Sequence, residues 1–318
     1  MNVVTDRYVK FFSEIKKGDI KILDSGVSTE LERRGCHMGE SYWSGRVSID
    51  AFETLVDVHK AYIDSGADII TTNSFASSRL VLIDSQDLKN IDEINNKNIE
   101  AALMARENLG ANDVLIAGSL SHQVAWDWGG RKFKKQSDIP VADEDMAQAF
   151  DETISYFENG EVDIILLEMM TIPRRINLLF ESLFTTDLPV WCGFSAKRYG
   201  KNSSLCSWHD HSVQFRKLLE HTRDCNFDIC GIMHSSVDII SECLDEIKCI
   251  LDRPLMAYPD SGYFKPPNWQ FEEIISPENL LDYSEGWVEQ GVSVIGGCCG
   301  LGPEHTKALT KLKNRHIT

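Results

Sequence analysis

The chain has 318 residues, of which 42% are hydrophobic and 25% are charged, and this composition is typical of a globular protein with a large core rather than of a disordered chain. Its 49 acidic and 32 basic residues give a formal net charge of -17, which repels nucleic acid and anionic membrane surfaces and excludes both as expected partners. No apolar run reaches the length that a membrane span needs. Length alone is compatible with two average domains or with one (β/α)8 barrel.

Nine cysteines are scattered along the chain, and no basic and apolar leader begins at Met1. An odd number of cysteines without a secretory leader does not fit a disulfide framework, so we expect a cytoplasmic protein. No linker-like or low-complexity stretch marks a domain boundary. We therefore expect residues 1–318 to form a single domain.

Short apolar segments alternate with amphipathic ones along most of the chain. The first apolar segment, 21–26, ends in small polar residues, as a buried strand does where it opens into a loop. The amphipathic segment 48–65 predicts a helix that Gly66 ends. Further strands are predicted at 67–74, 113–119, 162–168, 189–196, 227–234, 253–258 and 292–297, and further helices at 91–109, 143–158, 173–183, 210–222, 237–251, 277–290 and 303–313.

This alternation predicts an α/β fold, specifically a TIM barrel. Apolar strands that are each followed by a helix run parallel under a helical cover, and eight such units close a (β/α)8 barrel. An open doubly wound sheet is the alternative, but no G-x-G-x-x-G follows the first strand. The long connections 35–48, 122–141, 197–209 and 261–276 all follow strands, which places them at the barrel end where enzymes build their sites.

Two adjacent cysteines, Cys298 and Cys299, lie among glycines after the last predicted strand. Both sulfurs can serve one point only where the backbone leaves the strand pleat, and flanking glycines permit that. Two thiolates that share a metal ion are one interpretation. Two inert buried residues or a vicinal disulfide are the alternatives. A catalytic zinc ion would need a third protein ligand and would keep one position open.

His234 is the best candidate for the third ligand, because it ends a predicted strand two strands away from the cysteines. The gap is roughly 10 Å, which inward-pointing side chains on alternate strands can bridge. A hydrogen-bonded structural histidine is the alternative interpretation. Cys230 lies about 13 Å further down the same strand, and we expect it in the core.

Residues 296–305 read G-G-C-C-G-L-G-P-E-H and resemble the zinc-binding signature of the homocysteine S-methyltransferase family. Other stretches follow that family's order over nearly the whole chain. Residues 24–31 are similar to its D-G-G…T-E-L stretch, 66–75 to its G-A-D-I-I-T-T-N-S/T-Y/F stretch, 162–168 to its glutamate strand, and 258–262 to its Y-P-N-S/A-G turn.

The resemblance implies a zinc-dependent barrel enzyme that moves a methyl group from a small onium donor to the thiol of homocysteine, giving methionine. S-methylmethionine, a dimethylsulfonium compound and betaine are the donors considered. Where the family has three cysteine ligands, its G-x-N-C motif here ends in His234, so His234, Cys298 and Cys299 are the expected Zn2+ ligands. A different thiol or selenol acceptor, or a non-catalytic relative that binds an amino acid, are the alternatives.

The resemblance also assigns acceptor-binding residues. Asp24 and Glu168 correspond to positions that hold the amino group, and paired carboxylates suit an ammonium ion. Helix capping is the commoner role of a lone aspartate. We expect Ser25 beside them, and Asn73 either binds the substrate carboxylate or ties two loops together.

Aromatic side chains bind cationic methyl groups, so aromatic residues near the predicted site are donor-binding candidates. The candidates are Trp43, Phe75 and Trp126, with Trp128 nearby, and Met169 follows the glutamate strand. Aromatic residues in loops also serve as packing lids. The sequence leaves a homo-oligomer open.

Overall fold

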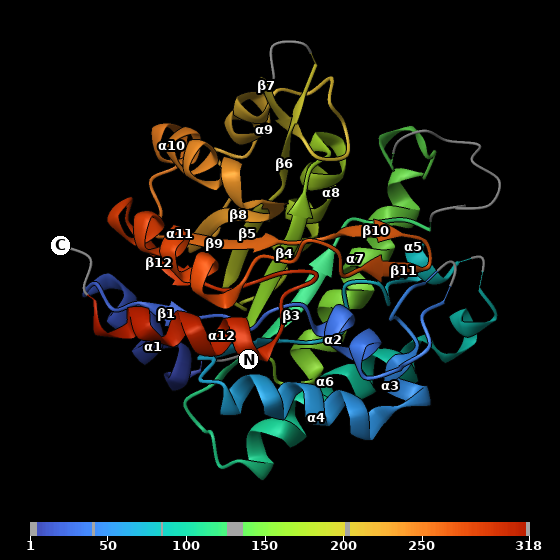
Figure 1. Cartoon of the computed structure of the whole chain (residues 1–318). Helices are drawn as coiled ribbons and strands as arrows, with labels where there is room; N and C mark the ends of the chain where they lie inside the picture. Colours follow the sequence, from blue (N-terminus) through green and yellow to red (C-terminus); the bar gives the residue numbers. More distant parts are fainter. Residues whose placement is uncertain (1–4, 40–41, 84, 126–135, 201–203, 316–318) are drawn as a thin grey trace.

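Parallel strands form the centre of the protein, with helices around them (Figure 1). The computed structural model describes residues 5–39, 42–83, 85–125, 136–200 and 204–315. In that part of the chain, eight strands lie in the order β1-β12-β9-β8-β5-β4-β3-β2. They are β1 (Lys21–Ile22), β2 (Ile69–Thr71), β3 (Leu115–Ser121), β4 (Ile164–Met170), β5 (Val190–Phe194), β8 (Ile229–Ser236), β9 (Leu255–Asp260) and β12 (Val292–Ile295).

The first and last strands in this order also meet, which closes the barrel. Leu23, just after β1, forms a parallel bridge with Ile69 of β2. The amide of Asp24 donates to the carbonyl of Ile69 at 2.9 Å, and the amide of Asp68 donates to the carbonyl of Ile22 at 2.7 Å. The predicted TIM barrel is confirmed, and the open doubly wound alternative is excluded.

The predicted helices follow the strands, with small changes in their bounds. The segment predicted as 48–65 is divided at Ala51, whose backbone is not helical. The larger helices are α4 (Phe52–Asp64), α6 (Ile91–Asn108), α7 (Asp143–Asn159), α8 (Pro173–Leu183), α9 (Phe215–His221), α10 (Ile240–Ile250), α11 (Pro277–Glu289) and α12 (Pro303–Leu309). Shorter ones are α2 (Val27–Arg33), α3 (Val47–Asp50), α5 (Arg79–Leu82), η1 (Gln86–Asn90), η2 (Gln136–Asp138), η3 (Val237–Ile239) and η4 (Thr310–Asn314). Among the described residues, no helix is both long and apolar enough to cross a bilayer.

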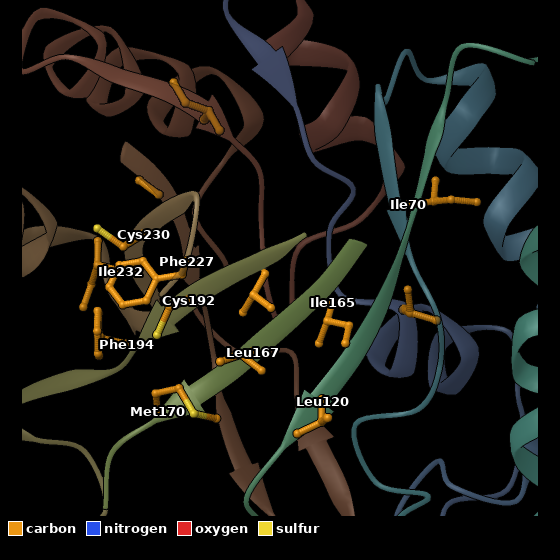
Figure 2. Close-up of a cluster of buried hydrophobic side chains, with 14 of the residues drawn as sticks. Ile70, Leu120, Ile165, Leu167, Met170, Cys192, Phe194, Phe227, Cys230 and Ile232 are labelled. Carbon is orange, nitrogen blue, oxygen red and sulfur yellow. The ribbon is translucent and has the colours of Figure 1, made fainter. Parts of the chain in front are cut away.

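Alternating strand residues build two separate apolar layers. Along β4, Ile165 and Leu167 pack in the layer between strands and helices, as Figure 2 shows together with Cys230 and its neighbours. Ile164 and Leu166 point to the other side and fill the barrel interior. This two-residue period is what a strand buried on both faces requires. Cys230 is fully buried in the outer layer, as predicted.

A helix that the sequence analysis did not predict, α1 (Asp6–Lys16), precedes the barrel. Thr5 caps it by accepting from the amide of Tyr8 at 3.2 Å. Tyr8, Phe11 and Ile15 pack into the apolar cluster of the barrel interior. Because the polar contacts of α1 reach residues that come just before strands, such as Asp228, this helix covers the N-terminal end of the barrel.

Asp163, just before β4, ties α1 to this end of the barrel. Its buried carboxylate accepts from Thr5 at 3.1 Å, from Arg106 at 2.8 Å and from the amide of Ile116 at 2.9 Å. It also forms an ion pair with Arg7 of α1. One buried charge therefore holds two arginines, a helix cap and a strand.

Two small hairpins lie in connections that we expected to be loops. They are β6 (Ala196–Tyr199) with β7 (Ser204–Ser207), and β10 (Tyr263–Lys265) with β11 (Asn268–Gln270). Both follow central strands, so they stand at the C-terminal rim, the barrel end where the carboxyl ends of the strands meet.

The Asp163→Ala variant should lower the free energy of unfolding by about 3 to 5 kcal/mol, because it leaves two partly buried arginines without their shared carboxylate. Urea denaturation followed by circular dichroism measures this change. The matched control is Asp113→Ala, which removes a carboxylate whose pair with Lys10 is exposed and should leave the midpoint nearly unchanged. Equal effects of the two variants would contradict this role of Asp163.

Candidate functional site

A cavity of about 430 Å³ opens at the C-terminal rim, and its volume is in the range of small-molecule sites. The cavity is lined by side chains that lie at or just after the carboxyl ends of different strands. They include Asp24 after β1, Glu168 of β4, His234 of β8, and Cys298 and Cys299 after β12. The fold thus brings residues that are far apart in the sequence to one place.

His234, Cys298 and Cys299 form a cluster whose ligand atoms all lie within 4.8 Å of one another. The sulfurs are 3.9 Å apart, and Nδ1 of His234 is 3.6 Å from Sγ of Cys298. Tetrahedral zinc with ordinary bond lengths requires about 3.8 Å between two sulfurs and about 3.6 Å between sulfur and nitrogen. These residues therefore fit a zinc ion without rearrangement of either pair. At this separation the two cysteines are not joined by a disulfide bond in this structure.

The loop that carries the two cysteines is held between the ends of β1 and β9. β12 ends at Ile295, so both cysteines lie outside the strand pleat. The amide of Gly297 donates to the backbone carbonyl of Asp24 at 3.1 Å, and the amide of Cys298 donates to the carbonyl of Pro259 at 2.8 Å. Gly300 has a φ of +80° and passes so close to Ser261 that a Cβ atom would clash with the carbonyl. Glycine is required there for both reasons.

A local irregularity of β8 directs His234 toward the cysteines. The register between β8 and β9 shifts after Met233, and His234 has a φ of 40°. Such a bulge re-aims a side chain and is common beside functional sites. Burial lowers the pKa of His234, but the Asp260 carboxylate, 3.5 Å away, and Cys298 outweigh it and raise that pKa to about 9.

The Cys298 thiol holds its proton when no cation is present. A hydrogen bond to Cys299, together with burial, raises the pKa of Cys298 well above its usual value. Since a thiolate is the form that binds metal, an ion must displace this proton when it enters.

Two buried carboxylates line the same cavity. Asp24 accepts from the amide of Thr71 at 2.7 Å and from its hydroxyl at 3.0 Å. Glu168 accepts from the hydroxyl of Ser119. Burial raises the pKa of Glu168 to about 7, and burial together with the charge of Glu168 raises the pKa of Asp24 well above its usual value. Both carboxyls therefore favour a cationic partner that would compensate for their burial.

Ser25 and Asn73 have partners within the protein. The hydroxyl of Ser25 lies 3.0 Å from that of Thr306 in α12. The Asn73 amide donates to the carbonyl of Ser44 at 2.9 Å and accepts from the hydroxyls of Ser44 and Ser28 at 3.0 and 3.2 Å. Of the two roles weighed for Asn73, this geometry favours tying loops together.

Aromatic side chains from the rim form one wall of the cavity. This aromatic wall consists of Trp43, Trp208, Phe264 and Trp269. The rings of Trp208 and Trp269 lie 5.4 and 5.9 Å from that of His234, and Phe264 stands 5.7 Å from Trp43. The two hairpins and the residues next to them supply all of the wall except Trp43.

The predicted donor-binding residues lie in part on this cavity. Trp43, Phe75 and Met169 line it, whereas Trp126 and Trp128 lie outside the described residues. Trp208, Phe264 and Trp269 were missed, although they fall in the long connections that we had placed at this rim. A search of those connections for every aromatic residue would have found them.

Basic groups also reach the cavity, from the side of the β6–β7 hairpin. Lys197 lies over the ring of Trp208, with 4.8 Å from its Nζ to the ring centroid. His209 lines the cavity, and burial followed by the charge of neighbouring His122 lowers the pKa of His209 well below its usual value. The cavity thus has carboxylates at the ends of β1 and β4 and a cationic side chain on the β6–β7 hairpin.

Comparisons with known proteins point to one family. The family model described as homocysteine S-methyltransferase matches residues 21–312. Similar proteins include a selenocysteine Se-methyltransferase of Brassica oleracea var. italica, 24% identical over 92% of this chain and 89% of the relative. Another is the homocysteine S-methyltransferase YbgG of Bacillus subtilis (strain 168), 23% identical over 91% of this chain and 92% of the relative.

Among solved structures, the homocysteine methyltransferase MmuM from Escherichia coli in its metallated form matches with a TM-score of 0.74. It is 24% identical, and the match covers 94% of this chain and 98% of that chain, which shows a shared fold. Because the family model extends over most of the sequence, this protein belongs to the homocysteine S-methyltransferase family.

Proposed function

We propose that this protein is a zinc-dependent methyltransferase that moves a methyl group from a small onium donor to the thiol of homocysteine. Membership of the family makes it a methyltransferase for a thiol or selenol acceptor. The observation that carries the finer proposal is that Cys298 lies at zinc-compatible distances from both His234 and Cys299, inside a cavity with an aromatic wall.

His234, Cys298 and Cys299 would hold the ion and leave its fourth position to the acceptor. Bound zinc would supply one chemical effect, which is to keep the acceptor sulfur as a thiolate at neutral pH without a general base. Catalytic zinc accepts two cysteines and one histidine. The chain's own part is to hold these ligands in place and to keep the cavity dry.

Asp24 and Glu168 would bind the ammonium group of the amino acid acceptor. Their raised pKa values record the cost of placing carboxylates in a buried site, and an ammonium ion between them offsets that cost. Selenocysteine, named in one relative, has the same amino acid end. We propose homocysteine as the acceptor on the family model, with a selenol as the second candidate.

The aromatic wall would bind the cationic methyl donor. The rings of Trp208 and Trp269 lie near that of His234, and desolvated aromatic rings attract onium groups. The acceptor sulfur then forms the new bond to the methyl carbon, while the bond to the donor heteroatom breaks and its electron pair stays on the donor. We propose a sulfonium donor, because a neutral thioether leaves more readily than a tertiary amine.

Replacing His234 tests the metal site. His234→Ala should lower zinc affinity by orders of magnitude, because one ligand is lost, whereas His234→Cys should retain the metal. Zinc content and competition with a chromophoric chelator measure both. His221→Ala, which removes an exposed histidine, is the matched control. Wild-type protein with well under one zinc per chain would refute the site, and stabilisation by homocysteine that a chelator does not reduce would indicate a binding protein instead.

Replacing Trp208 tests the donor site. Trp208→Leu keeps an apolar side chain but removes the aromatic face, so the KM for a sulfonium donor should rise by about 5- to 30-fold, equivalent to about 1 to 2 kcal/mol. The KM for homocysteine should change little. Steady-state assays with S-methylmethionine measure this, and Phe184→Leu at an exposed position is the control. Equal weakening of binding of the neutral thioether product would show that the ring merely packs.

Replacing Glu168 tests the buried carboxylate through pH. The pKa of Glu168 is raised from 4.5 to about 7 in the folded protein, so unfolding releases a proton between these values. The stability of the ligand-free protein should therefore fall as pH rises from about 4.5 to 7 and then level off. Glu168→Gln should lose less stability over that range. Thermal unfolding at pH 5 and 8 measures the difference, with Glu278→Gln, at an exposed position, as control. Parallel pH profiles for all three proteins would contradict it.

A further inference from the structure

A carboxylate that the metal site does not use stands directly beside its histidine. Oδ2 of Asp260 is 3.5 Å from Nδ1 of His234, and the side chains are only 16% and 11% exposed. Among the described residues, Asp260 forms no other ion pair. We infer that Asp260 is an outer-sphere part of the metal centre and that its negative charge acts together with His234 as one unit. This inference rests on the zinc site proposed above.

The backbone fixes Asp260 to both cysteines. The amide of Cys298 donates to the carbonyl of Pro259 at 2.8 Å, and the amide of Ser261 donates to the carbonyl of Cys299 at 3.0 Å. The residues on both sides of Asp260 are therefore bonded to the two cysteines. On its other side, Asp260 is in register with Ser236 of β8, just past the bulge that directs His234. A carboxylate held from both sides in this way has a defined place next to the ion.

Charge explains what this position does. Two thiolates and a neutral imidazole carry one negative charge fewer than three thiolates do. The Asp260 carboxylate supplies the missing negative charge from a position just outside the three ligands. Because the carboxylate faces Nδ1, which is also the ring nitrogen nearest Cys298, it acts on the ion through its charge, and such neighbours outside the ligand set strengthen metal binding. Zinc at His234 is then less electron-poor than a Cys2His site without the carboxylate.

The sequence supports the same pairing. Compared with the motifs that the chain resembles, G-x-N-C has become G-I-M-H, and Y-P-N-S/A-G has become Y-P-D-S-G. The first change removes an anionic ligand and the second adds an anion. These two changes fall at His234 and Asp260, which contact each other.

The carboxylate acts through its charge rather than as a ligand. The separation of 3.5 Å from Nδ1 is longer than a hydrogen bond. Asp260 also lies outside the set of groups that converge on one point. It is therefore a positioning and charge-compensating residue, and its loss should change metal affinity without changing the number of ligands.

The test is a double-mutant cycle read by metal affinity. In the wild-type background, Asp260→Asn should weaken zinc binding by about 10- to 100-fold. In the His234→Cys background, the same change should not weaken it, because three thiolates already supply the charge. Asp238→Asn, which removes an exposed carboxylate after β8, is the control and should have no effect. Competition with a chromophoric chelator gives the affinities.

The visible spectrum of the Co2+-loaded protein is the second readout. Asp260→Asn should keep a four-coordinate spectrum, and a change of coordination number would overturn the outer-sphere assignment by making Asp260 a ligand. Equal loss of affinity in both backgrounds would show a merely structural role and overturn the pairing. If His234→Cys does not fold, unchanged affinity in Asp260→Asn alone still overturns the inference. Wild-type protein that binds no zinc would refute the proposed function itself, which distinguishes the two failures.

Discussion

Closure of a parallel barrel is the constraint on which the site depends. When β1 pairs with β12 on one side and meets β2 on the other, the carboxyl ends of all central strands are drawn to one rim. Asp24, Glu168, His234 and Cys298 each stand at or just after such an end. These residues are far apart in the sequence, so local structure alone could not bring them together. The topology brings these residues together, and the chemistry of their side chains determines which ligands the site can bind.

The site also shows how a buried cluster is kept ready for a ligand. The buried carboxyls of Asp24 and Glu168 are costly to ionise when the cavity is empty. Packing of the surrounding core, which forms two layers along the strands, offsets this cost. An ammonium group at these carboxylates would compensate for their charge, as a cation would at the two cysteines.

Much of the fold and part of the site could be predicted from the sequence, because hydrophobic periodicity and the glycines that end strands and helices are local signals. The strands of the barrel and the exit of Cys298 from the last strand follow from apolar runs and glycines. The arrangement of the aromatic wall was not predicted, since Trp208 and Trp269 lie in or beside two hairpins that were expected to be loops. Asn73 was ambiguous because an amide that binds a ligand and one that ties loops look alike in sequence. Helix α1 was missed because it stands before the alternation begins.

Helix α1 determines which end of the barrel the substrates can use. Since Tyr8, Phe11 and Ile15 fill the N-terminal end, both substrates must use the opposite mouth. The carboxylates and cysteines stand at the strand ends, whereas three members of the aromatic wall come from the hairpins beyond them. A donor seated against the wall would therefore lie over the acceptor and block its exit. Turnover should then follow a compulsory order, with the amino acid entering first and its methylated product leaving last.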